Sequence, residues 1–168
     1  MQLFQSLSDE QQSNLIMLGS KAVMDPWFKA LVSIPLTLNL VYLPHFIKLA
    51  AVTPLVHVNY NNVNPRYTDW DESLQNKPVA EFVKRCIGCH LNAWEAFIAF
   101  VPAVLLCRIQ KADGKTVSDL CMKFLKFRAL YTLLYLAGQW KIVSVLRTIV
   151  WGLGLQTTGE LYMKALLA

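Results

Sequence analysis

Residues 85–107 read RCIGCHLNAWEAFIAFVPAVLLC. Most of this stretch is apolar enough to lie in lipid, yet it carries Asn92 and Glu95 one helical turn apart. A charged side chain near the centre of a bilayer costs about 3 kcal/mol. In a helix, Arg85, Gly88, Asn92 and Glu95 fall on one narrow stripe. We therefore expect this stripe to face other helices or a wet pocket and not lipid.

The composition is that of a membrane protein. Of the 168 residues, 55% are hydrophobic and only 16% are charged, which is more apolar than an ordinary soluble domain. The four cysteines lie in or beside apolar segments at irregular spacing, so we expect free thiols and not the disulfide framework of a secreted scaffold. The sequence thus predicts an integral membrane protein.

Long apolar runs divide the chain into four expected membrane spans. Pro35, Pro44 and Pro54 should bend the first span, which is tolerated because neighbouring helices can satisfy the freed carbonyls. Ser8 and Gln11 have the spacing of a capping box, so a short surface helix should precede the first span. We predict an all-α, four-helix membrane bundle over residues 26–168, with an N-terminal surface segment at 1–25 and spans at about 27–58, 78–109, 117–138 and 140–166.

The net charge of +5 comes from basic residues that flank the apolar segments. They form no isolated patch with interleaved aromatic residues, which excludes nucleic acid as a partner and makes membrane lipids the expected surroundings. Four spans place both termini and the basic connection 108–128 on one side, which the positive-inside rule makes cytoplasmic or matrix. The polar connection 59–78 then lies on the other side. The first residues show no signal-peptide pattern, so no cleaved presequence is expected.

Cys86, Cys89 and His90 form a C-x-x-C-H motif, which is the attachment pattern for c-type haem. The two thiols and the imidazole would supply two covalent attachments and an axial iron ligand. The motif lies at the end of a membrane helix, however, and small buried hydrophobic residues are the more common role of free cysteines. As zinc ligands these residues would lack a defined fourth ligand, so no metal site is expected. Haem is a minor alternative that a pyridine haemochrome spectrum would test.

Two further groups of residues resemble a known family. The first is His90-Leu-Asn92-Ala-Trp-Glu95, which follows a charged lead-in, an apolar helix and a long polar loop. The second is the later run of Arg128, Tyr131, Tyr135, Gly138 and Leu146-Arg147-Thr-Ile-Val-Trp151-Gly152. Together they are similar to the MAPEG superfamily, the membrane-associated proteins of eicosanoid and glutathione metabolism, over roughly residues 25–168.

The resemblance implies a left-handed bundle of four helices per chain, assembly as a homotrimer, and glutathione bound between neighbouring subunits. Carried over by position, it implies that Asn92, Glu95 and Tyr131 help to hold glutathione, while Tyr135 and Arg147 complete the site or activate the thiol. Glutathione presents two carboxylates and an amine, which arginines and a carboxylate would match. A nearby cation also lowers the pKa of a thiol, so that the nucleophilic thiolate is populated.

The chain departs from the family pattern at two places. Gly88 stands where the family has an arginine four residues before the asparagine, so a carboxylate of glutathione loses a partner there. Arg85, one turn earlier on the same stripe, is our candidate for binding this carboxylate instead. Arg147 also follows Tyr135 by about one turn more than the family pattern suggests.

Two functions are compatible with these features. In the first, the chain is a divergent bundle with weakened or lost turnover that serves as an accessory subunit of a larger membrane complex, such as an energy-transducing complex of the mitochondrial inner membrane. In the second, it is an active glutathione transferase or peroxidase of an organelle membrane such as the endoplasmic reticulum, acting on lipophilic electrophiles. The two departures favour the accessory role. The retained Asn92, Glu95 and tyrosines favour glutathione binding.

Overall fold

The computed structural model describes residues 8–53, 69–70, 74, 77–138 and 140–168. Within these residues the chain forms five helices: α2 (Asp9–Met24), α3 (Phe28–Val52), α5 (Lys77–Ile109), α6 (Gly114–Ala137) and α7 (Lys141–Leu166). The predicted all-α architecture is confirmed. The end of the first expected span, with Pro54, most of the polar connection 59–78 and the first seven residues lie outside the described part of the chain.

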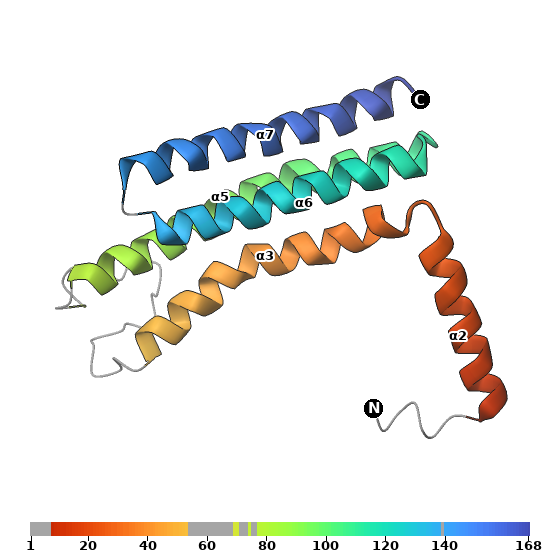
Figure 1. Cartoon of the computed structure of the whole chain (residues 1–168), viewed down its shortest axis with the longest axis horizontal. Coiled ribbons are helices and arrows are strands. Elements are labelled where there is room, and N and C mark those ends of the chain that lie inside the picture. Colours follow the sequence, from red (N-terminus) through yellow and green to blue (C-terminus); the bar gives the residue numbers. More distant parts are fainter. Residues whose placement is uncertain (1–7, 54–68, 71–73, 75–76, 139) are drawn as a thin grey trace.

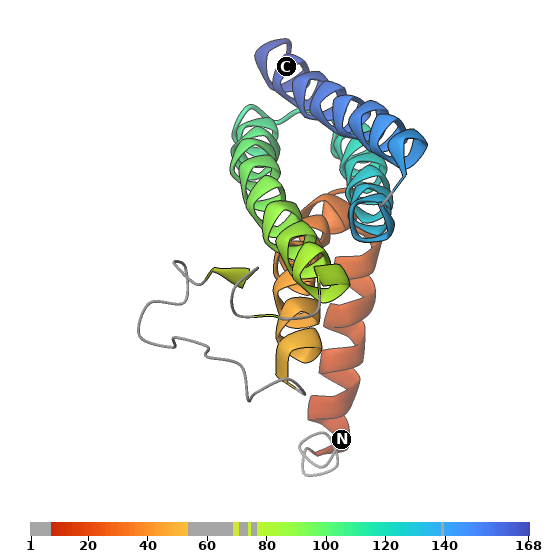
Figure 2. The same ribbon diagram turned by 90° about the vertical axis from the view of Figure 1, so that its left-hand side faces the viewer.

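Four of these helices, α3, α5, α6 and α7, lie side by side with aligned long axes (Figure 1). In the order of the chain, α3 and α6 run in one direction along this bundle, and α5 and α7 run in the other. The view along the bundle (Figure 2) places α5 and α6 between α3 on one side and α7 on the other. Each of the two middle helices therefore packs against both α3 and α7.

Aromatic and small apolar side chains fill the centre of the bundle. Phe100 of α5 and Phe124 of α6 stack with their ring centroids 4.0 Å apart. Cys107 and Cys121 are fully buried in the same cluster, and all four cysteines of the chain are free thiols. The cysteines of the cluster serve as small hydrophobic residues, as the sequence suggested.

The membrane-spanning character differs between the helices. Within the described residues, Phe28–Val52 and Pro78–Ile109 are long and apolar enough to cross a membrane by length and composition. The helices α6 and α7 fall short of the same test, because Lys123, Lys126 and Arg128 interrupt α6 and polar residues lower the hydropathy of α7. Both nevertheless run along the bundle beside α5 (Figure 1). Some of their polar side chains must therefore find partners inside the bundle.

The N-terminal helix α2 leaves the end of the bundle at which α3 begins and runs across the bundle direction (Figure 1). Its start is the predicted capping box: the Ser8 amide donates to Gln11 Oε1 at 3.0 Å, and the Gln11 amide donates to Ser8 Oγ at 3.3 Å. Met17 and Met24 are exposed on it. If the bundle axis is the membrane normal, such a helix lies parallel to the membrane surface, and this placement stays a prediction.

The start of α3 is tied to the start of α6 by one buried hydroxyl. Ser118 Oγ donates to the carbonyl of Pro26 at 2.5 Å and accepts the amide of Ala30 at 3.1 Å. The second bond satisfies one of the amides that the first turn of a helix leaves without an internal partner. At the start of α6, Asp113 caps the helix by accepting the amide and hydroxyl of Thr116, and these hydrogen bonds lower the pKa of the Asp113 carboxyl.

Replacement of Ser118 by alanine should lower the free energy of unfolding by about 1–3 kcal/mol, because the buried Ala30 amide loses its acceptor. Denaturant titration of the protein in detergent micelles, followed by circular dichroism, measures this change. Ser20→Ala is the matched control, since Ser20 also bonds to a backbone carbonyl but is exposed. Equal stability of the two variants would show that the Ser118 bonds do not hold α3 to α6.

Candidate functional site

Polar side chains from three helices meet along one side of the bundle, between α5, α6 and α7. The α5 residues are those of the stripe seen in the sequence. The contributing side chains are Asn92 and Glu95 of α5, Arg128, Tyr131 and Tyr135 of α6, and Arg147 of α7. We refer to this group as the polar groove.

Arg128 is the deepest charged residue of the polar groove, with only 3% of its surface exposed. One guanidinium nitrogen, Nη2, donates to Asn92 Oδ1 at 3.1 Å, and the guanidinium carbon lies 4.4 Å from the centre of the Tyr131 ring. The amide nitrogen of Asn92 in turn faces Glu95 Oε2 at 3.4 Å. The amide is thus oriented with its oxygen toward a cation and its nitrogen toward a carboxylate.

Within the described residues no carboxylate lies within ion-pairing distance of Arg128. A buried cation without a close anionic partner is costly, and here its compensation comes from the Asn92 amide oxygen, the Tyr131 ring face and the more distant charge of Glu95. The unpaired positive charge makes the inner part of the polar groove suited to an anionic group.

Arg147 reaches the polar groove from α7. Its guanidinium carbon lies 4.2 Å from the centre of the Tyr135 ring, and its Nη2 donates to Ser144 Oγ at 3.3 Å. Tyr135 and Tyr131 form an edge-to-face pair with centroids 5.5 Å apart. The long spacing between Tyr135 and Arg147 in the sequence therefore does not separate them, because the turn between α6 and α7 brings the two side chains together.

Gly88 is the point where α5 accepts the Tyr135 side chain. A Cβ atom at position 88 would lie 2.6 Å from the Tyr135 hydroxyl oxygen. The phenol thus occupies the space in which an arginine side chain would begin. This contact gives a physical reason for the glycine that departs from the family pattern.

Three hollows follow one another along this side of the bundle. The outermost is an open cleft of about 820 Å³ at the end of the bundle where α5 and α7 begin. The second, about 250 Å³, shares Tyr135 and Arg147 with the cleft, and the third, about 110 Å³, shares Trp151 with the second. The polar groove therefore runs from a wide mouth toward the buried Arg128, with the exposed Glu95 at its edge.

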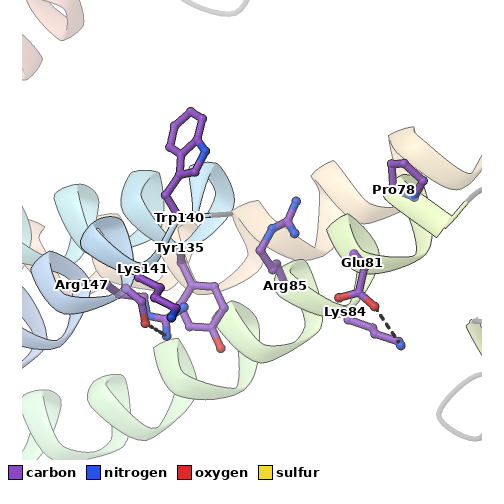
Figure 3. Close-up of a pocket in the computed structure, with 10 residues that line it drawn as sticks. Pro78, Glu81, Lys84, Arg85, Tyr135, Trp140, Lys141 and Arg147 are labelled. Atoms are coloured by element: carbon purple, nitrogen blue, oxygen red, sulfur yellow. Dashed lines mark hydrogen bonds and ion pairs between the residues drawn. The ribbon is translucent and has the colours of Figure 1, made fainter.

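The mouth is positively charged. Figure 3 shows Tyr135 and Arg147 at one side of it, the Lys84–Glu81 pair at the other and Arg85 between them. Lys84 Nζ is 3.3 Å from Glu81 Oε1, so the remaining cations of the mouth are Arg85, Lys141 and Arg147, from α5 and α7. Such a mouth would concentrate ligands that carry carboxylates or phosphates.

Arg85 has an unusual environment. Its guanidinium carbon lies 5.6 Å from the Phe82 ring, and its Nε is buried with no hydrogen-bond partner among the described residues. Buried polar atoms usually have a partner. Arg85 therefore lies at the mouth with one buried donor that no described residue satisfies.

The structure thus brings together five of the six residues that the sequence singled out, namely Asn92, Glu95, Tyr131, Tyr135 and Arg147, and it places Arg85 at the mouth. Arg128 belongs to the run of residues that resembles the family, but sequence reasoning missed it as a site residue. The signal was present in its i, i+3, i+7 spacing to Tyr131 and Tyr135. A cation on the same helix face as two phenols indicates that this face of α6 meets the polar stripe of α5.

The Cys86–Cys89–His90 motif does not fit a covalently attached haem. Both thiols are fully buried, and His90 Nδ1 lies 2.7 Å from the carbonyl oxygen of Val41 on α3. Attachment would require both thiols at the edge of a macrocycle and an imidazole free to bind iron. The motif instead packs α5 against its neighbours. No group of three or more His, Cys, Asp or Glu side chains suited to a metal occurs in the described part of the chain.

Gly88→Ala should fail to gain the ~1 kcal/mol of stability that alanine has over glycine inside a helix, since the added methyl group forces Tyr135 to move. Tyr135→Phe removes the hydroxyl oxygen, which is the atom nearest to the added methyl group. The free-energy cost of Gly88→Ala should therefore be smaller in the double variant. Thermal unfolding of the two single variants and the double variant gives the coupling between the two positions. Gly152→Ala is the control, because a Cβ atom there meets nothing within 4 Å. Additive effects at positions 88 and 135 would contradict the contact.

Comparison with known proteins supports the resemblance seen in the sequence. A model of the MAPEG family matches residues 29–167. No curated protein and no solved structure matches the chain.

Proposed function

This chain belongs to the MAPEG family of integral membrane four-helix bundles, and from that premise we propose that it binds glutathione in the polar groove and transfers the glutathionyl group, through its sulfur, to lipophilic electrophiles. The observation that carries the proposal is the buried Arg128, held by Asn92 near Glu95, with no carboxylate of the described residues within ion-pairing distance. An arrangement that leaves a cation without an anion is costly for a structural role alone. It is well suited to a ligand that brings carboxylates.

The charges of the polar groove match those of glutathione. The tripeptide has two carboxylates, one ammonium group and one thiol. Arg85 and Lys141 at the mouth and Arg128 in the interior are the candidate partners of the carboxylates, since charge-assisted hydrogen bonds to arginine are strong and directional. Glu95 is the candidate partner of the ammonium group. Tyr131 completes the wall of the site.

Arg147 and Tyr135 are the candidate activating residues. A cation beside a thiol lowers its pKa and populates the thiolate, and the phenol of Tyr135 can donate a hydrogen bond to a sulfur anion. The thiolate sulfur would then attack the electrophilic carbon, forming a C–S bond while the leaving group departs with its electron pair. In an addition reaction the substrate instead takes up the proton that the thiol has lost.

Glu95 also argues for a neighbouring subunit. It lies near the middle of a membrane-spanning helix but is exposed in the single chain, as are Leu91 and Ile98 on the same helix. A carboxylate facing acyl chains is costly. We therefore include in the proposal that another copy of the chain covers this edge of the polar groove, in the homotrimer that the family resemblance implies. The lipophilic substrate would enter laterally from the membrane.

One observation favours the accessory role as a second candidate. The Tyr135 phenol fills the space at Gly88, so the carboxylate that an arginine there would bind depends on Arg85. Weak binding with no turnover would leave a bundle that serves as a subunit of a larger membrane complex. For this second candidate we predict a large complex in the mitochondrial inner membrane. For the transferase we predict a homotrimer in the endoplasmic reticulum.

Arg128→Gln should weaken glutathione binding about 10- to 100-fold, because a hydrogen bond to a charged group contributes about 1.5–3 kcal/mol. Isothermal titration of the purified protein in mild detergent measures the affinity. Lys164→Gln is the matched control, because Lys164 is an exposed cation in the last turn of α7, far from the groove.

Conjugation of glutathione to a generic aromatic electrophile, assayed on the same samples, separates the two candidates: binding with turnover supports the transferase, and binding without turnover supports the accessory role. No binding by the unaltered protein would overturn the proposal.

Arg85→Ala should reduce the affinity for glutathione while Arg85→Lys retains part of it, if Arg85 replaces the arginine missing at position 88. The neighbouring Lys84→Ala provides a comparison within the same mouth. Arg85→Ala and Lys84→Ala each remove one positive charge, so a purely long-range electrostatic effect would lower the glutathione affinity equally in the two variants. Unchanged affinity of Arg85→Ala would remove this residue from the site.

A further inference from the structure

A second basic cleft lies on the outer surface of the bundle, away from the polar groove. It has a volume of about 510 Å³ and is formed where the first turn of α3 meets the first half of α6. Its lining residues are Lys29, Asp119, Met122, Lys123, Lys126 and Phe127. We refer to it as the basic cleft.

The position of Lys29 in the basic cleft is set by the hydroxyl of Ser118. Because Ser118 bonds to both Pro26 and Ala30, the first turn of α3 is held against α6. The three lysines, from two helices, therefore converge on one volume and are not independent surface charges.

The basic cleft carries a net positive charge. Lys29, Lys123 and Lys126 contribute three cations, and Asp119 contributes one carboxylate. Glu160 of α7 is 3.5 Å from Lys123, an exposed contact that adds little stability. Lysine is a common partner of phosphate groups because its ammonium acts as a compact point charge.

The surface next to the basic cleft changes from charged to apolar along both helices. On α6, Lys126 is followed at helical spacing by Leu130 and Leu133, which are 43% and 66% exposed. On α3, Lys29 is followed at intervals of seven by Leu36 and Leu43, which are 40% and 41% exposed. Residues at these intervals share one face of a helix.

The two apolar stripes begin at the same end of the bundle, because α3 and α6 run in the same direction (Figure 1). From Lys29 to Leu43 the distance along the helix is about 21 Å. The hydrocarbon of one leaflet is about 15 Å thick. The α3 stripe is thus long enough to follow an acyl chain from the headgroup to the bilayer centre, and the α6 stripe, about 10 Å from Lys126 to Leu133, runs beside its first part.

We propose that the basic cleft binds the phosphate of an anionic glycerophospholipid, whose acyl chains lie along the exposed leucines of α3 and α6. Basic pockets between membrane helices bind lipid headgroups in this way. A free phosphate would use the lysines but leave the leucine stripes without a role. The match of a cationic end to an apolar continuation therefore favours a lipid. This site is independent of glutathione binding in the polar groove.

The test is lipid retention by the full-length protein. The protein is reconstituted into phosphatidylcholine nanodiscs that contain phosphatidylglycerol, extracted in mild detergent and examined by native mass spectrometry. The triple variant Lys29→Gln, Lys123→Gln, Lys126→Gln should lose most of the retained phosphatidylglycerol. The charge-matched control should retain the phosphatidylglycerol, because its three substitutions lie outside the basic cleft: Lys111→Gln, Lys115→Gln and Lys164→Gln. Asp119→Asn should increase retention, because it removes the repulsive charge.

A second pair of variants tests the apolar part of the site. Leu130→Asn with Leu133→Asn should lower retention of the lipid while the lysines are intact. Equal loss in the two triple variants would overturn the proposal in favour of general surface attraction. Displacement of the lipid by millimolar inorganic phosphate would show a soluble-phosphate site instead. A change in the oligomer mass of the first triple variant, with no change in bound lipid, would show that another copy of the chain covers the basic cleft.

Discussion

The buried contact between Arg128 and Asn92 is the constraint around which the bundle is arranged. A guanidinium with 3% exposure needs compensation, and it receives this from the Asn92 carbonyl oxygen at 3.1 Å and the face of Tyr131. Asn92 is brought to Arg128 by the packing of α5 against α6, and Tyr131 lies one turn along α6 from the arginine. The same contact explains how α6 can carry an arginine within the bundle, since the guanidinium is directed toward α5 and not into lipid.

The polar groove depends on a tyrosine that is placed by a glycine. With no side chain at position 88, α5 leaves space for the Tyr135 hydroxyl, and Tyr135 in turn supports Arg147 at 4.2 Å. The residue that departs from the family pattern therefore has a structural role of its own. It positions a phenol and a cation together at the entrance to the groove, where the proposed chemistry needs an acid and a positive charge.

Helical periodicity predicted much of this arrangement, because it depends only on local spacing. Asn92 and Glu95 on one stripe follow from residues three apart, and the all-α bundle follows from the long apolar runs. What the sequence could not provide were relations between helices. The contact of Gly88 with Tyr135, and the approach of Arg147 to Tyr135 across the turn between α6 and α7, depend on how the helices pack. The C-x-x-C-H motif shows the same limit: its spacing left haem open as a minor alternative, and only tertiary packing shows that both thiols are buried and that His90 has a backbone partner.

The central claim is that the space between Asn92, Arg128 and Arg147 is a ligand site closed by a neighbouring copy of the chain. A cryo-electron microscopy map of the protein in lipid nanodiscs, collected with glutathione present, tests this most directly. We predict tripeptide density in the polar groove, with Glu95 covered by the adjoining subunit. A map in which acyl chains fill the groove and Glu95 faces lipid would contradict the account.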